Sequence, residues 1–361
     1  MPRPTIARID LDAVRHNYRR ACEQAGQARA MAVVKADGYG HGIGAIARAL
    51  AGEAPCFAVA CLEEAEAIRA QGLDHPVVLL QGVHARDDLH ICQHHGFEPV
   101  MHSPEQLEWL EETAVSLVIW LKLNTGMNRL GFPPASLPTL MTQLRRHPQI
   151  RVKGLMTHYA CADDLASTDT EAQTTVFTSA AQAYPELLLS AGNSAAHFRP
   201  QGSLFDWSRP GIMLYGATPM SERSATELGL RPAMSLESQL ISVRTLEPGM
   251  RVGYGGSWTA DKPTPMGIVA IGYGDGYPRH AGTGTPAAVN GQRIRLIGRV
   301  SMDMLAVDLS QAPEAAVGDT VELWGGQVSV DEVAACAGTI GYELLTGVTA
   351  RVPRFYRESS G

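Results

Sequence analysis

The chain has 361 residues, enough for two domains or for one barrel with an appended domain. Apolar residues make up 45% and charged residues 19%, which is ordinary for a soluble enzyme. The net charge of −7 comes without a basic block or an acidic tail, which argues against nucleic acid or an anionic membrane as the main partner.

Neither a targeting segment nor a metal site is expected. The amino terminus has no signal-type apolar stretch, and no apolar run reaches transmembrane length. The six cysteines are scattered without Cys-x-x-Cys spacing, so we interpret them as free thiols and expect a cytoplasmic protein. His90 and His94 lie four residues apart on a predicted helix, but no third ligand is evident, so we predict no metal.

Up to about residue 215, short apolar runs alternate with helical patterns. The predicted strands end near Lys35, Ala60, Gln81, Met101, Lys122, Met156, Ser190 and Arg209. Helical stretches lie between most of them, for example over 43–51, 63–70, 104–112 and 170–183. Eight strand–helix units are the count of a (β/α)8 barrel of the TIM type. A further helix over 9–22, capped by Asp10 or Asp12, precedes the first barrel strand.

After about Pro232 the pattern changes to β-rich segments separated by Gly, Pro and Asp. The segments cover 235–246, 267–271, 287–297, 305–309 and 320–324. They predict a mainly-β domain that follows the barrel. We place the boundary in the polar stretch 221–232 and divide the chain into a barrel over 1–228 and a β domain over 229–361.

One lysine stands at the end of the first apolar strand, directly before a glycine-rich loop. From residue 32 the chain reads Ala-Val-Val-Lys-Ala-Asp-Gly-Tyr-Gly-His-Gly, and the lysine is Lys35. An amine in a partly dry site has a lowered pKa and acts as a nucleophile or a base. It can form a Schiff base with an aldehyde cofactor, while the loop behind it can hold a phosphate. On this run alone, an ordinary strand-end lysine is an equally good interpretation.

The barrel prediction favours the functional interpretation of this lysine. In such barrels the chemistry lies at the carboxyl ends of the strands. Five predicted strand ends carry chemically versatile side chains, namely Lys35, Lys122, His158, Asn193 with Ser194, and Arg209.

With these residues assembled, the chain closely resembles the alanine racemase family from Val33 to Tyr356. The shared motifs follow one another in the family's order and cover 34–42, 121–131, 156–160, 193–196, 209–212, 253–255, 272–276, 299–303 and 351–353. The resemblance implies a pyridoxal 5′-phosphate enzyme that interconverts L-alanine and D-alanine. It also implies a head-to-tail homodimer in which each active site is shared between the two chains.

The resemblance assigns two bases to the reaction. Lys35 would hold the cofactor covalently and then act as a base on one face of the substrate. Tyr254, in a Gly-Tyr-Gly turn of the β domain, would act on the other face, because a proton taken from one side must return on the other. A phenol with a pKa near 10 is a poor base at neutral pH, so it needs a partner, and His158 is the family's candidate. The tripeptide alone would more readily describe a packed turn tyrosine.

The resemblance also assigns the cofactor and substrate contacts. The cofactor-binding residues would be Lys35, Tyr39, Arg129, His158, Asn193, Ser194, Arg209, Gly211 and Ile212. Hydroxyls and backbone amides would hold the phosphate. Arg209 would face the pyridine nitrogen and leave it unprotonated, which makes the ring a weaker electron sink. Arg129 and the backbone amide of Met302 would bind the substrate carboxylate.

Lys122 is the position at which many family members carry a carbamylated lysine, and we predict this modification here. The carbamate would turn a cation into an anion that orients Arg129. Two residues depart from the family pattern. Asn124 stands where an aspartate is usual, so a hydrogen bond is kept and a charge pair is lost. Ala350 stands where some members carry a tyrosine that touches the phosphate, and Tyr342 is the candidate replacement.

Three other functions share parts of this pattern. A serine or broad-specificity racemase would have the same architecture, and pocket size cannot be read from a sequence. A decarboxylase on the same barrel is disfavoured by the Gly-Tyr-Gly base and by Arg209, since decarboxylation gains from a protonated ring. A pyridoxal-phosphate carrier without catalysis is disfavoured by the β domain, because such carriers are usually single barrels.

Overall fold

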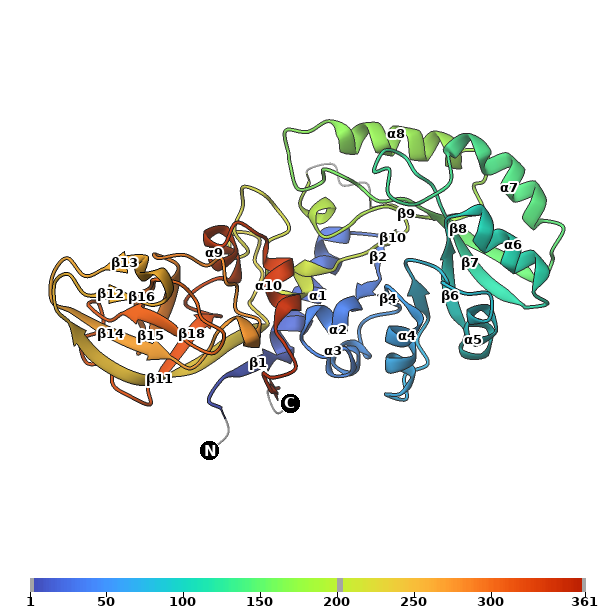
Figure 1. Cartoon of the computed structure of the whole chain (residues 1–361). Helices are drawn as coiled ribbons and strands as arrows, with labels where there is room; N and C mark the ends of the chain where they lie inside the picture. Colours follow the sequence, from blue (N-terminus) through green and yellow to red (C-terminus); the bar gives the residue numbers. More distant parts are fainter. Residues whose placement is uncertain (1–2, 200–203, 359–361) are drawn as a thin grey trace.

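A parallel barrel occupies the chain up to about residue 215 in a computed structural model that describes residues 3–199 and 204–358 (Figure 1). Its strands are β2 (Arg29–Ala30), β3 (Ala32–Val33), β4 (Phe57–Val59), β5 (Val77–Leu79), β6 (Phe97–Met101), β7 (Leu117–Lys122), β8 (Ile150–Met156), β9 (Leu188–Ser190) and β10 (Trp207–Ser208). The sheet order β2-β10-β9-β8-β7-β6-β5-β4-β3 brings the first strands beside the last one.

The nine assigned strands correspond to eight positions, because β2 and β3 are successive pieces of one strand. Only Met31 separates them, and its N–H donates to the carbonyl of Ser208 at 2.9 Å. The next N–H, of Ala32, donates in the other direction to Cys56 on the β4 side at 2.9 Å. Successive N–H groups of one extended segment thus donate to the two neighbouring strands in turn. The predicted (β/α)8 barrel is confirmed.

Helices cover the outside of the barrel, in the blue-to-green part of Figure 1. They are α1 (Leu11–Ala25), α3 (Ile43–Leu50), α4 (Leu62–Arg69), α5 (Asp88–His95), α6 (Pro104–Glu112), α7 (Leu137–Leu144) and α8 (Asp169–Ala181). The short segment α2 (Lys35–Tyr39) differs from these, because it follows β3 as a turn with left-handed residues. Short 3₁₀ helices, η2 (Ala195–Phe198) and η3 (Ile212–Tyr215), follow β9 and β10. The predicted helix over 9–22 begins two residues later as α1, because Asp10 is the cap and accepts from the N–H of Ala13 at 3.0 Å.

The β domain is built on an eight-stranded sheet of order β14-β17-β16-β15-β18-β11-β1-β19. Its strands are β11 (Met234–Leu246), β14 (Thr264–Val269), β15 (Pro286–Val289), β16 (Gln292–Ile297), β17 (Leu305–Asp308), β18 (Thr320–Trp324), β19 (Arg354–Arg357) and, from the start of the chain, β1 (Ile6–Asp10). A two-stranded ribbon is formed by β12 (Arg251–Val252) and β13 (Trp258–Thr259), and two helices, α9 (Val330–Cys336) and α10 (Gly341–Gly347), follow β18. The predicted mainly-β domain is confirmed.

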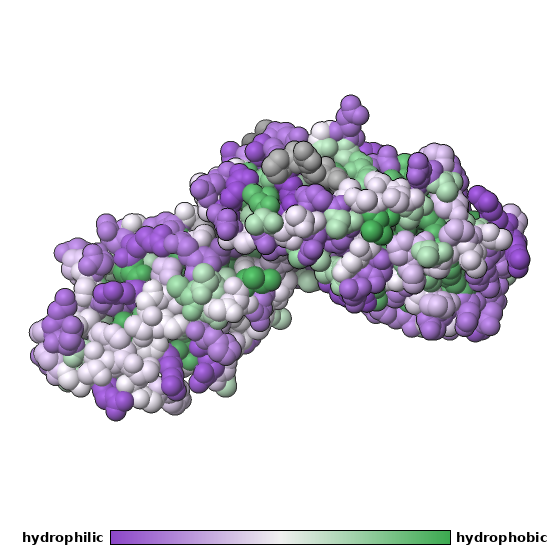
Figure 2. Space-filling view, turned by 90° about the horizontal axis from the view of Figure 1, so that it is seen from above, coloured by the Kyte–Doolittle hydropathy of each residue, from purple (hydrophilic) through white to green (hydrophobic). Residues whose placement is uncertain are grey.

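Strand β1 links the two lobes. It is antiparallel to β11 and parallel to β19, so the start and the end of the chain lie side by side in the second sheet. The division at residue 228 stays a prediction, and β1 shows that the second sheet also takes a strand from before the barrel. Figure 2 shows the two lobes joined by a narrower waist. None of the described helices is both long and apolar enough to cross a membrane.

Candidate active site

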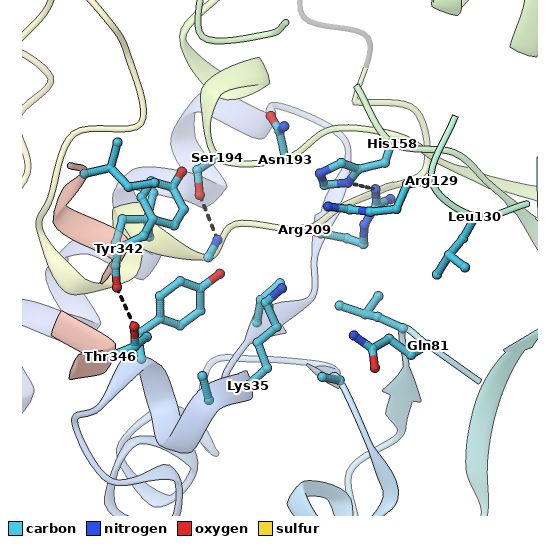
Figure 3. Close-up of a pocket in the computed structure, with 18 of the residues that line it drawn as sticks. Lys35, Gln81, Arg129, Leu130, His158, Asn193, Ser194, Arg209, Tyr342 and Thr346 are labelled. Atoms are coloured by element: carbon cyan, nitrogen blue, oxygen red, sulfur yellow. Dashed lines mark hydrogen bonds between the residues drawn. The ribbon is translucent and has the colours of Figure 1, made fainter. Parts of the chain in front are cut away.

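A cavity of about 690 Å³ opens at the carboxyl ends of the barrel strands (Figure 3). It is lined by Val33, Lys35, Ala36, Tyr39, Ala60, Leu80, Gln81, Lys122, Arg129, Leu130, Met156, His158, Asn193, Ser194, Arg209, Gly211 and Ile212, and from the β domain by Ile340, Tyr342, Glu343 and Thr346. This volume is in the range of small-molecule sites. The barrel-borne residues that the resemblance assigned to the cofactor all line this one cavity.

Lys35 follows β3 by two residues and points into the middle of the cavity (Figure 3). The four residues after it, Ala36, Asp37, Gly38 and Tyr39, all have φ between 51° and 61°, in the left-handed region. Each non-glycine residue there costs about 1–2 kcal/mol, so this turn is strained and is held by its neighbours. Asp37 helps to hold it, because its carboxylate accepts from the N–H of Ile43 at 2.8 Å.

Burial, and then the positive charge of Arg129, lower the pKa of the Lys35 amine. A lowered pKa increases the neutral fraction of the amine, which is the form that attacks a carbonyl carbon. Partial burial and a lowered pKa are the two properties that the sequence analysis associated with a reactive amine, and Lys35 has both.

An anion cradle lies across the cavity from Lys35. Ser194 Oγ accepts from the N–H of Gly211 at 2.8 Å, which leaves the Ser194 hydroxyl proton to be donated. Gly211 stands at the start of η3 and touches Tyr39, since a Cβ at this position would lie 2.4 Å from Tyr39 Oη. Tyr39 is held in turn by stacking on Tyr215, with ring centroids 4.7 Å apart. Hydroxyls and amides that converge in this way suit a phosphate.

Arg209 is buried and fixed in place by its neighbours. Its guanidinium donates to Ser190 Oγ at 2.6 Å, to the carbonyl of Thr157 at 2.6 Å and to the carbonyl of Ala191 at 3.0 Å. It also lies 3.2 Å from Nδ1 of His158. Burial lowers the pKa of Arg209 to about 10, so the side chain remains a cation at neutral pH.

His158 is neutral in this environment. Burial, followed by the charge of Arg209, lowers its pKa well below the ordinary value. Because Arg209 donates to Nδ1, the ring proton of His158 is placed on Nε2. Arg129 lies next to both side chains at the same end of the cavity (Figure 3).

Lys122, the last residue of β7, is a buried amine among cations. Burial, and then Arg209, Arg129 and Lys35, lower its pKa to about 7. A large part of this amine is therefore neutral at neutral pH, which is the form that reacts with carbon dioxide. The predicted carbamylation has a chemical basis in this lowered pKa.

The loop that presents Arg129 is ordered by Asn124. Asn124 Oδ1 accepts from the N–H groups of Gly126 at 3.2 Å and Asn128 at 3.0 Å. Its Nδ2 donates to Asn128 Oδ1 at 3.0 Å, a bond that an ionised aspartate could not donate. The hydrogen-bonding role expected at this position is thus present, with an added donor.

Two predicted residues lie away from this cavity. Tyr254 sits in the 3₁₀ turn η4 (Tyr254–Gly256) of the β domain with 72% of its surface exposed, and Met302 is 53% exposed. Neither lines the cavity that holds Lys35. Within one chain the fold therefore gathers the barrel-borne residues and leaves these two on the outside of the second domain.

Gln81, Tyr342 and Thr346 line the cavity although the sequence analysis did not count them among the cofactor-binding residues. Gln81 stands at a predicted strand end and was within reach of the barrel argument. Tyr342 and Thr346 reach the cavity only because α10 packs against the lysine loop, where a Cβ on Gly40 would lie 2.2 Å from the carbonyl oxygen of Leu345. The Tyr342 and Tyr39 rings are 6.2 Å apart, so Tyr342 is placed beside the anion cradle.

Comparison with known proteins agrees with this arrangement over both domains. The family model described as alanine racemase, N-terminal domain, matches residues 9–219, and that of the C-terminal domain matches 233–356. An alanine racemase from Marinobacter nauticus is 64% identical over 99% of this chain and 100% of its own length.

Solved structures show the same architecture. The biosynthetic alanine racemase from Pseudomonas aeruginosa superposes with a TM-score of 0.96 at 49% identity, over 99% of this chain and 100% of that one. The alanine racemase from Bartonella henselae, solved with covalently bound pyridoxal phosphate, has a TM-score of 0.89 at 28% identity, over 99% and 100%.

The barrel, its half-buried lysine and the appended β domain define an amino-acid racemase. The chain belongs to the alanine racemase family.

Proposed function

We propose that this protein interconverts L-alanine and D-alanine with pyridoxal 5′-phosphate, in active sites shared between two copies of the chain. The observation that carries the proposal is the Lys35 amine, held in a cavity with an anion cradle on one side and cationic side chains on the other. High identity to named alanine racemases over the whole chain supports alanine as the substrate.

The residues of the cavity fit pyridoxal phosphate. Lys35 provides the amine for a covalent bond, and Tyr39, Ser194, Asn193 and the amides of Gly211 and Ile212 provide the anion site. The close contact between Gly211 and Tyr39 Oη leaves room only for a glycine beside that hydroxyl. When bound, the cofactor withdraws electrons from the substrate α-carbon and so makes its proton acidic.

Arg209 and His158 tune this end of the site. Arg209 keeps its own proton, so a ring nitrogen opposite it would accept a hydrogen bond and stay unprotonated. His158, neutral with its proton on Nε2, is a donor facing the cavity rather than a cation. This arrangement limits charge withdrawal into the ring and so favours return of the proton over side reactions.

Two bases on opposite faces would move the proton. Lys35 takes or returns it on one face, and Tyr254 of the partner chain on the other. The exposure of Tyr254 and Met302 supports this arrangement, since both stand on the β domain, where Tyr273 and Met304 are exposed as well. A second copy that covers this surface would bring the tyrosine to a lysine that its own chain does not reach.

Arg129 and the partner's Met302 amide would bind the substrate carboxylate. A carbamate on Lys122 would add a negative charge among the cations at this end of the cavity and so hold Arg129 in place. The lowered pKa of Lys122 supports the modification.

The name of one relative supports a proposal for the cellular role. The 49% identical Pseudomonas aeruginosa protein is named a biosynthetic alanine racemase, which favours supply of D-alanine for peptidoglycan over alanine breakdown. We place the protein in the cytoplasm, with neither nucleic acid nor membrane as a partner.

Subunit mixing tests the shared site. Lys35→Ala and Tyr254→Phe chains should each be inactive as pure dimers. After equal mixing under exchange conditions, half of the dimers are hybrids with one intact site, so about one quarter of the wild-type activity should return.

The matched control mixes Lys35→Ala with the Lys35→Ala/Tyr254→Phe double variant, which restores no lysine and should stay inactive. Loss of optical activity from L-alanine is the readout. If the hybrid mixture stays inactive although subunit exchange is demonstrated, the shared site is refuted.

A further inference from the structure

The strained turn after Lys35 is held from outside the cavity. Its far end is secured by Asp37, which bonds the N–H of Ile43, and by Arg354, whose Nε donates to the carbonyl of Gly40 at 3.2 Å. Its near end is the N–H of Ala36, the residue directly after Lys35. That N–H donates to Oε1 of Glu64 at 2.6 Å.

Glu64 also holds the neighbouring strand end. It lies in the first turn of α4, and its second oxygen, Oε2, accepts from the N–H of Ala60 at 2.8 Å. Ala36 and Ala60 both line the cavity, whereas Glu64 does not. One half-buried carboxylate therefore joins the ends of β3 and β4 from behind the cavity wall.

The bond to Ala60 alone would be a local helix cap, because Glu64 reaches back only four residues. The bond to Ala36 is different, since it crosses 28 positions in the sequence to reach another strand–helix unit. An ionised acceptor makes both bonds stronger than neutral ones. Because Ala36 starts a run of left-handed residues, losing this bond releases the turn next to the reactive lysine.

We propose that Glu64 is a positioning residue that fixes the direction of the Lys35 amine by holding Ala36 and Ala60 through their N–H groups. This inference rests on the proposed function, in which Lys35 holds the cofactor. Glu64 touches neither the cofactor nor the substrate in this role.

Glu64 also acts on Lys35 through its negative charge. Burial, Arg129 and Arg209 lower the pKa of Lys35, and Glu64 raises it. Lys122 is a further titratable amine near Lys35, since the charge of Lys35 lowers the pKa of Lys122. Glu64 thus offsets part of the positive field at the lysine while it holds the backbone.

Glu64→Gln is the sharpest test, because it keeps the shape, removes the charge and leaves an amide N–H₂ facing one of the two N–H donors. In the full-length chain, amide exchange at Ala36 or Ala60 should become faster. The affinity for pyridoxal 5′-phosphate should fall about tenfold, the effect of one lost charge-assisted bond. The pH midpoint for covalent capture at Lys35 should nevertheless move down, because the amine loses its stabilising charge.

Glu66→Gln is the matched control, with the same change on the same helix at an exposed side chain. This variant should leave amide exchange at Ala36 and Ala60, the affinity for pyridoxal 5′-phosphate and the pH midpoint of capture unchanged. Glu64→Asp keeps the charge on a shorter side chain. The pH midpoint of capture should therefore stay near that of wild type, while amide exchange at Ala36 or Ala60 becomes faster. This variant replaces Glu64→Gln in the test if Glu64→Gln does not fold. Capture is measured by borohydride reduction and mass analysis of the Lys35 peptide.

The proposal is overturned if Glu64→Gln and Glu66→Gln have the same amide exchange rates at Ala36 and Ala60 and the same pH midpoint of capture at Lys35. If Glu64→Gln binds pyridoxal 5′-phosphate more weakly but keeps the pH midpoint of capture, the role of Glu64 is merely structural, and the proposal is overturned as well. If the wild type captures no cofactor at Lys35, the proposed function fails instead, and amide exchange at Ala36 still decides whether Glu64 holds the turn.

Discussion

Replacing Gly211 by alanine should weaken cofactor binding through one identifiable contact. A Cβ at this position would lie 2.4 Å from Tyr39 Oη and 3.2 Å from Cζ. Ordinary contact between such atoms begins near 3.5 Å, so the hydroxyl must move by about 1 Å. Tyr39 has little freedom to do so, because its ring stacks on Tyr215 and lies near Tyr342.

The magnitude follows from the bond that is lost. Hydrogen bonds to charged groups contribute about 1.5–3 kcal/mol, which corresponds to about 10- to 100-fold in the dissociation constant for pyridoxal 5′-phosphate. At Gly211 φ is −120°, so the substitution does not place an alanine in the left-handed region. The expected loss therefore comes from the displaced hydroxyl and the disturbed anion cradle.

Cofactor affinity is measured by titrating the cofactor-free protein and following the visible absorbance of the lysine-bound form. Gly282→Ala is the control, since a Cβ there meets nothing within 4 Å, and it should bind as wild type does. Tyr39→Phe removes the clashing oxygen, so in the double variant Gly211→Ala should cost much less than it does alone. Gly211→Ala binding within twofold of wild type, or fully additive losses in the double variant, would refute this reasoning.

Three further predictions concern other parts of the molecule. In the cofactor-free protein, Lys122 has a pKa of about 7 against 10.5 for the free side chain, so the unfolded state binds more protons between these values. The free energy of unfolding should thus rise with pH across that window, by at most about 1.4 kcal/mol per pH unit. Denaturant unfolding at several pH values measures this rise, which should be absent in Lys122→Met. With labelled bicarbonate, a carbamate NMR signal should grow from pH 6 to pH 8 and vanish in Lys122→Gln; a signal that persists in the variant contradicts the assignment. Arg3 donates to Asp275 at 2.7 Å and to Asp303 at 3.1 Å, next to Met302, so Arg3→Gln should raise KM for alanine about two- to fivefold, whereas Arg8→Gln, which breaks an exposed ion pair with Glu237, should leave KM unchanged.

The order of elements and the barrel part of the site were predictable from local patterns. The eight predicted strand ends lie within two residues of the observed ones, because apolar runs of a parallel sheet are buried on both faces and stand out from amphipathic helices. Once the strands are placed, the barrel brings Lys35, Lys122, His158 and Arg209 together, since carboxyl ends meet at one face.

Residues that come from outside the repeating units were not predictable in this way. No pattern in the sequence placed β1 in the second sheet, Thr346 at the cavity, or Arg3 against Asp303. Each of these contacts joins segments more than 200 residues apart, and a pairing at that separation depends on how the two lobes dock.

The sequence by itself determined the class of fold, the place of Lys35 at a strand end and the chemical kinds of its neighbours, because these follow from side-chain type and from position along a strand. Only the tertiary structure decided the electrostatics and the support of the site. The pKa of Lys122, the neutrality of His158 and the hold of Glu64 on the lysine turn depend on burial and on distances of a few ångströms. Those quantities exist only once the chain has folded around the cavity.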